Sequence, residues 1–113
     1  MVTEQAVLDV VEGEELAFEA AFGTARQIIS SMPGFQSLRL LRCLERPNRY
    51  LLLVEWATLE DHTVGFRGST EYQEWKRLLH HFYDPFPTVE HFSPVIGGRV
   101  DRRCASPEQG SSL

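Results

Sequence analysis

The sequence predicts an α+β domain of the ferredoxin-like type, with the element order βαββαβ. Three observations support this: stretches that alternate as strands do, two stretches with the apolar spacing of amphipathic helices, and a short polar turn between the middle strands. The chain has 113 residues, of which 42% are hydrophobic and 24% charged, values that suit one globular domain. This order predicts a four-stranded antiparallel sheet with both helices on one face.

The first two elements are a strand and a helix. In residues 4–11, one face of an alternating pattern is apolar and the other is mixed, which indicates a strand: Ala6, Leu8 and Val10 lie on the first, and Gln5, Val7, Asp9 and Val11 on the second. Residues 14–31 have apolar side chains every three or four positions, the period of a helix with one buried stripe. Pro33 and Gly34 then end the helix, because proline cannot continue its hydrogen bonds and glycine accepts the turn. The predicted stripe consists of Phe18, Ala21, Phe22, Ala25, Ile28, Ile29 and Met32.

The middle of the chain predicts a β-hairpin. Residues 35–45 and 50–56 are apolar strand candidates, and the polar turn 46–49 between them is short enough to make them antiparallel neighbours.

Polar residues mark the starts of the remaining elements. Thr58 is a predicted helix cap, with Asp61 at the capping-box position of a short helix. Ser69 is a predicted cap for a second helix that runs to about Phe82. Residues 88–92 form the last strand candidate. We therefore expect a folded domain over residues 1–95 and a polar C-terminal tail over residues 96–113.

The predicted sheet has apolar residues on both faces. Residues 50–54 (Tyr-Leu-Leu-Leu-Val) do not alternate, and leucines of the preceding strand also fall on both sides. Two helices cover one face only, and an exposed apolar sheet promotes aggregation. We expect a second copy of the chain to cover the other face, with the two sheets about 10 Å apart. The alternatives are scattered surface leucines or a tail that folds back.

Composition argues against several partners. The formal net charge is −5, from 16 acidic and 11 basic residues, and no basic stripe favours nucleic acid or an anionic membrane. No apolar run reaches the roughly 20 residues of a membrane span. Cys43 and Cys104 lie far apart and predict free thiols. With no signal-peptide pattern, these features favour a cytoplasmic protein.

Several motifs together resemble the antibiotic biosynthesis monooxygenase (ABM) family. They are the turn 32–35 (MPGF), the strand 48–56 (NRYLLLVEW), the segment 60–62 (EDH) and the segment 89–92 (VEHF). The resemblance covers residues 2 to about 95. It implies a homodimer whose two sheets form an α/β barrel, with a pocket between helices and sheet. Some members of the family oxygenate polycyclic aromatic substrates without a cofactor, and others bind and degrade haem.

The resemblance also indicates catalytic candidates. His62, Phe66 and Tyr72 stand where the oxygenases commonly have Asn, Trp and Tyr. We expect His62 to act as a base, since a histidine titrates near neutrality, and Tyr72 to donate a hydrogen bond. A structural histidine is the alternative. Adjacent histidines, His80 and His81, diverge by about 100° on a helix, so we predict no metal site.

Four further residues are substrate-binding candidates. Phe66 can face the same pocket as His62, because the two are four residues apart. Trp75 shares a helix face with Tyr72, so the two rings line a pocket for a flat ligand or belong to the core. Arg39 interrupts an apolar strand and either anchors a substrate anion, borders the subunit interface or pairs with Glu55. Phe22, on the first helix, completes the set.

Two functions are compatible with these residues. The first is a monooxygenase that needs no cofactor and acts on a small aromatic or polycyclic molecule. The alternative is a non-catalytic dimer that binds a hydrophobic small molecule, with haem as the cofactor candidate, or a haem-degrading relative. The fold alone does not choose between them, because one fold supports several functions.

Overall fold

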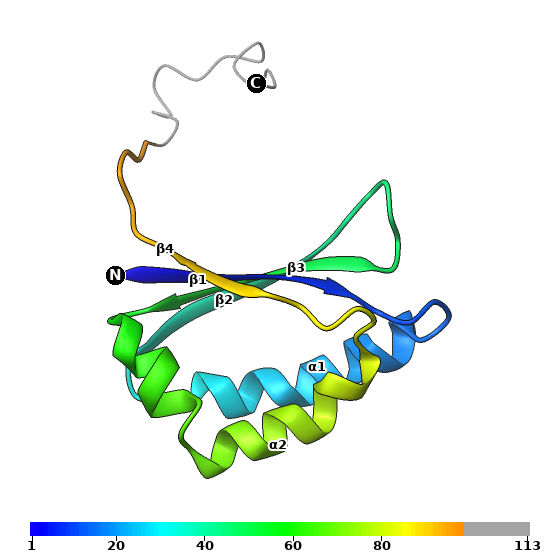
Figure 1. Ribbon diagram of the computed structural model, residues 1–113, viewed down its shortest axis with the longest axis horizontal. Helices are drawn as coiled ribbons and strands as arrows, with labels where there is room; N and C mark the ends of the chain where they lie inside the picture. The colour runs from blue at the N-terminus through cyan, green and yellow to red at the C-terminus, as the bar shows by residue number, and fades with distance from the viewer. Residues whose placement is uncertain (99–113) are drawn as a thin grey trace.

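A computed structural model describes residues 1–98 and shows the predicted element order (Figure 1). The four strands form one antiparallel sheet in the order β2-β3-β1-β4, and both main helices lie on one side of it. This arrangement confirms the α+β ferredoxin-like fold. The elements are β1 (Val2–Asp9), α1 (Glu15–Ser30), β2 (Phe35–Arg42), β3 (Arg49–Trp56), the π-helix η1 (Asp61–Phe66), α2 (Thr70–Leu79), the 3₁₀ turn η2 (His80–Phe82) and β4 (Val89–Phe92).

The core lies between the helices and the central strands β1 and β3. Every second residue of β3, from Tyr50 to Trp56, is buried against the helices, as period-2 alternation requires. On α1 the predicted stripe is confirmed at four positions, which are buried, whereas its other three members are at least partly exposed. The buried stripe consists of Phe18, Phe22, Ala25 and Ile29.

The predicted caps are confirmed. The backbone N–H of Tyr72 donates to the Ser69 hydroxyl at 3.1 Å, which starts α2. Thr58 and Asp61 exchange reciprocal bonds of 3.1 and 3.2 Å, as a capping box does. The short helix that follows is a π-helix, in which the N–H of Arg67 donates to the carbonyl of His62, five residues back.

Several element bounds differ from the expectation by one to three residues. Strand β2 ends at Arg42 rather than at residue 45, because the chain there turns into the hairpin connection. Leu44 is therefore not on the sheet and is 91% exposed. The predicted tail, 96–113, lies mostly outside the described residues, as does Cys104. Within residues 1–98, no helix is both long and apolar enough to cross a lipid bilayer.

The outer face of the sheet carries an apolar row across three strands. Val7 on β1 lies opposite Leu51 on β3, and Leu51 lies opposite Leu41 on β2. Val7 is 39% and Leu41 37% exposed, and the row borders a hollow of about 320 Å³. Polar residues such as Gln5 flank the row, so the outer face is mixed and the helix-facing side is the more apolar.

Gly34, between α1 and β2, provides a test of this fold. Its φ is 82°, and a Cβ there would overlap the carboxylate of Asp61. We expect Gly34→Ala to lower the free energy of unfolding by at least about 1–2 kcal/mol, since left-handed backbone disfavours L side chains. Gly23→Ala is the matched control. A Cβ at Gly23 meets nothing within 4 Å, so this helical substitution should stabilise by roughly 0.5–1 kcal/mol. Equal urea midpoints for the two variants would contradict the left-handed conformation of Gly34 and its close approach to Asp61.

Candidate functional site

A buried carboxylate, Glu4, is the first component of the site. Strand β1 places Glu4 on the helix-facing side, in phase with Ala6 and Leu8, and the side chain is only 5% exposed. The indole Nε1 of Trp56 on β3 donates a hydrogen bond of 3.0 Å to Glu4 Oε1. A buried carboxylate requires such partners, because unpaired it would cost several kcal/mol.

His62 is the second component. The π-helix places it over the sheet, where it is 3% exposed and its ring stacks on Trp56, with centroids 5.4 Å apart and planes 20° from parallel. Its Nε2 lies 3.3 Å from Glu4 Oε1. The imidazole is therefore held between an indole face and a carboxylate.

His91, on the edge strand β4, is the third component. It lies directly opposite Glu4 in the β1–β4 register, and its Nε2 is 2.8 Å from His62 Nδ1. His91 is half-buried and borders a small cavity of about 200 Å³ at the sheet edge. The other residues that line this edge cavity are Val2, Leu59, Phe92 and Ser93. We call the series Glu4, His62 and His91 the buried polar chain.

The surroundings favour the neutral form of each group in the chain. Burial raises the pKa of Glu4, against the Trp56 hydrogen bond and the positive charge of Arg67, which lower it. Burial, with Arg67 and His91, lowers the pKa of His62 from its ordinary 6.5 to about 3. Burial and Arg67 also lower the pKa of His91. His62 is thus a neutral imidazole at physiological pH, with one ring nitrogen protonated.

Five of the six residues that the sequence predicted lie in one packed cluster. The ring of Phe66 lies 6.4 Å from that of His62, 5.3 Å from that of Tyr72 and 5.7 Å from that of Trp75. The ring of Trp75 also contacts Phe22, at 5.7 Å. Phe66, Trp75 and Phe22 are buried, so in this structure they are core residues, whereas Tyr72 is half-buried.

Besides Tyr72, a further tyrosine, Tyr83, lies near the buried polar chain. Burial raises the pKa of Tyr83, and the charges of Glu4 and Tyr72 raise it further. Tyr83 is therefore within electrostatic reach of Glu4, whereas Tyr72 is linked to His62 through the ring of Phe66.

Arg39 lies apart from the other predicted residues. It is on the outer face of the sheet, opposite Leu53, with the sheet between it and the cluster. Within residues 1–98 it is not paired with Glu55, whose carboxylate accepts bonds of 2.9 and 3.0 Å from the Thr3 hydroxyl. Its position on the outer face is the one that an interface residue would have.

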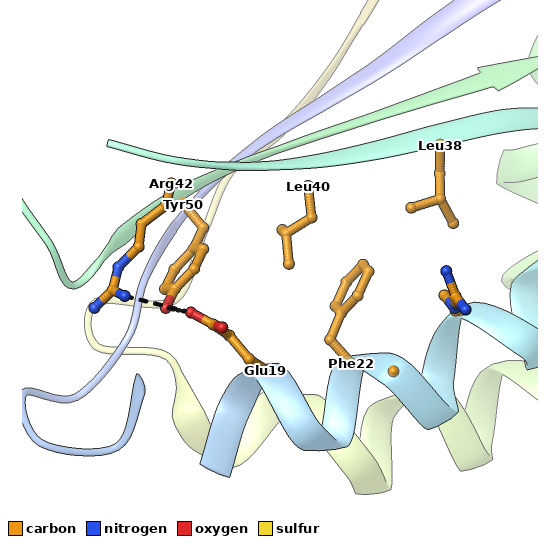
Figure 2. A pocket seen from close by; sticks show the side chains of 8 residues that line it. Glu19, Phe22, Leu38, Leu40, Arg42 and Tyr50 are labelled. Atoms are coloured by element: carbon orange, nitrogen blue, oxygen red, sulfur yellow. Dashed lines mark hydrogen bonds and ion pairs between the residues drawn. The ribbon is translucent and has the colours of Figure 1, made fainter. Parts of the chain in front are cut away.

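A larger cleft, of about 560 Å³, lies between α1 and the β2 side of the sheet. Figure 2 shows Phe22 below Leu38 and Leu40, with a polar group at one end. There the Tyr50 hydroxyl donates to Glu19 at 2.6 Å, and Arg42 lies 3.5 Å from the same carboxylate. Burial and Glu19 raise the pKa of Tyr50 to about 12, so its phenol is a donor and not a base.

The sequence alone did not predict Glu4, Trp56 or His91 as site residues. For Glu4 a signal was present, because it falls in phase with the apolar residues of a strand, where a carboxylate must be buried or functional. His91 gave no such signal, since its contact with His62 depends on how β4 pairs with β1.

The buried polar chain is not arranged as a metal site. The two nitrogens of His62 face different partners, Glu4 and His91, and so do not converge with them on one point. No group of three potential ligands for a single ion occurs within residues 1–98.

Comparisons with known proteins agree with this fold. The sequence pattern of the antibiotic biosynthesis monooxygenase family matches residues 1–78. YczJ, an uncharacterized protein of Bacillus subtilis strain 168, is 62% identical over 95 residues, which is 84% of this chain and all of YczJ. The chain therefore belongs to the antibiotic biosynthesis monooxygenase family, as its sequence indicated.

Solved structures show the same architecture. A Bordetella bronchiseptica protein described as an antibiotic biosynthesis monooxygenase is 36% identical, with a TM-score of 0.80 over 84% of this chain and 97% of its own. SnoaB, a cofactor-independent oxygenase from Streptomyces nogalater, is 21% identical, with a TM-score of 0.68 over 85% of this chain and 94% of its own. At that identity SnoaB shares the fold alone.

The low pKa of His62 predicts acid sensitivity. The unfolded chain protonates this histidine below about pH 6.5 and the folded chain does not, so stability is lost as pH falls through that value. Between pH 7 and pH 5, the wild type should lose on the order of 2 kcal/mol more unfolding free energy than His62→Gln. In both proteins the raised pKa of Glu4 has the opposite effect on how the unfolding free energy changes with pH. If urea titrations show that the two proteins lose the same unfolding free energy between pH 7 and pH 5, the lowered pKa of His62 is disproved.

Proposed function

We propose that the protein is a cofactor-independent oxygenase that acts on an electron-rich aromatic small molecule, such as a phenol or an anthrone. The observation that carries the proposal is the neutral imidazole of His62, held by Glu4 and His91 beside an aromatic cluster. Membership of the family and the shared fold with SnoaB, a cofactor-independent oxygenase, support it.

The reaction needs a base more than it needs a bound cofactor. Removal of a proton gives a substrate anion that can reduce oxygen itself, and recombination forms a peroxide at the activated carbon. Loss of water leaves a carbonyl: a CH₂ group and O₂ become C=O and H₂O, so the substrate supplies all the electrons. The protein would accept the proton through the buried polar chain, of which His62 is the middle member, and would orient the substrate.

The remaining predicted residues have supporting roles in this proposal. Tyr72, half-buried beside Phe66, would complete the aromatic cluster next to His62, since it is not among the residues that line the edge cavity. Phe66 and Trp75 would hold the cluster in place. Arg39, on the outer face, would lie at the interface between two copies. We assign the substrate to the edge cavity because His91 lines it, whereas the cleft under α1 lies on the opposite, β2 side of the sheet.

Oxygen uptake tests the proposal. The purified protein, incubated with anthrone or dihydroxynaphthalene, should consume oxygen, and with ¹⁸O₂ one labelled atom should appear in the product. His62→Gln should be slower by about 10²-fold or more, the usual contribution of a positioned base.

His81→Gln is the matched control, because His81 is exposed and has no part in the chain, and it should keep the wild-type rate. Equal rates for both variants would exclude His62 as the base. No uptake with any such substrate, together with a haem absorbance shift on titration, would favour the binding function instead.

We also propose that the protein is a homodimer that pairs through the outer face of its sheet. The row of Val7, Leu41 and Leu51 is apolar and at least partly exposed in the single chain. In addition, the edge cavity of about 200 Å³ is smaller than the roughly 300–1,000 Å³ of typical small-molecule sites. We infer that a second copy would supply the remaining walls of the site. Phe92, which is 47% exposed, links the cavity to that face.

Sedimentation tests the dimer. At low micromolar concentration the wild type should sediment as two subunits and Leu51→Glu as one, because the substitution buries a charge in the proposed interface. Leu44→Glu should remain dimeric, since Leu44 is exposed in the hairpin turn. A wild-type protein that sediments as a folded single subunit would refute the pairing.

A further inference from the structure

The buried polar chain runs in one direction, from the core to the edge of the sheet. Glu4 is 5% exposed on the central strand β1, His62 is 3% exposed above it, and His91 is half-buried on the edge strand β4. The two steps of the chain measure 3.3 and 2.8 Å. Both ring nitrogens of His62 take part, so each imidazole can receive a proton on one nitrogen and release one from the other.

We propose that Glu4 is the terminal proton acceptor of the site and that His91 is the residue through which the proton enters. The proposal rests on the oxygenase function proposed above and names the path that its base would use. A phenol in the edge cavity would face His91, whose Nδ1 has no hydrogen-bond partner within residues 1–98.

Each proton in the path is accounted for. The phenol O–H bond breaks and its proton binds His91 Nδ1. His91 Nε2 then gives its proton to His62 Nδ1, and His62 Nε2 gives its proton to the carboxylate of Glu4. The products are a phenolate and a neutral carboxylic acid, with both histidines returned to neutral as the other tautomer. No charge is left on an imidazole inside the core.

The environment of the chain favours this end state. Burial opposes a charge on Glu4 and on both histidines, and Arg67, the nearby cation, opposes a positive charge on either imidazole. The groups that face the chain from other elements are Trp56, which donates to Glu4, and Tyr83, within electrostatic reach of Glu4. A carboxylate in such a place gains by becoming a neutral acid when a proton arrives.

Ionisation of a bound phenol tests the path without turnover. Under nitrogen at pH 6, para-nitrophenol is titrated with wild-type protein, and the yellow anion is followed by its absorbance. We expect the wild type to ionise the bound probe without releasing a proton to the buffer, because Glu4 retains it. In Glu4→Gln and in His91→Gln each ionised probe should instead release one proton, which a pH indicator in weak buffer detects. His81→Gln should match the wild type.

Imidazole ¹⁵N resonances report the same event. In the wild type, probe binding should move the proton of His62 and of His91 from Nε2 to Nδ1, whereas in Glu4→Gln the two tautomers should not change. If Glu4→Gln does not fold, His91→Gln decides the matter, since it leaves the contact between Glu4 and Trp56 in place.

Three results would overturn the path: a wild type that releases one proton for each probe it ionises, a His91→Gln variant that releases none, or a probe that leaves the His91 resonances unmoved. The failure of oxygenation is a separate result. A wild type that ionises the probe but consumes no oxygen would retain the proton path and lose the proposed reaction.

Discussion

The burial of one carboxylate constrains much of this structure. Glu4 stands in the middle of an apolar face, where an ionised side chain without partners would cost several kcal/mol. Trp56 from β3 and His62 from the π-helix supply contacts to it, and His91 from β4 contacts His62 in turn. Three strands and one helix thus meet around a single carboxyl group, which fixes their relative positions more narrowly than apolar packing would.

The two edges of the sheet have different chemistry. At the β4 edge, neutral imidazoles lead inward from a small cavity. At the β2 edge, a larger cleft is lined by apolar side chains and ends in the group formed by Glu19, Tyr50 and Arg42, in which the hydrogen bonds are already satisfied. Since the family fold supports more than one function, the distinction between these sites carries more information than the fold itself.

From local sequence patterns we could predict which side chains of a strand face inward and where a helix begins. Alternation identified which β1 side chains face inward, and Ser69 identified the start of α2. These patterns did not bring Glu4 and His91 together, because pairing between the first and last strands depends on the assembled sheet. The structure places His62, Phe66 and Tyr72, which the family resemblance had grouped, in one cluster of rings, whereas Arg39 lies on the other face of the sheet.

The π-helix has an evolutionary consequence. Its wide turn, closed by the bond from the N–H of Arg67 to the carbonyl of His62, accommodates one more residue than an ordinary turn would. Removal of a single codon there would restore the usual helical winding and rotate His62 by about 100° away from Glu4. Among descendants of one ancestral gene, a short deletion and not a series of point changes could therefore separate chains that keep this inner contact from chains that have lost it.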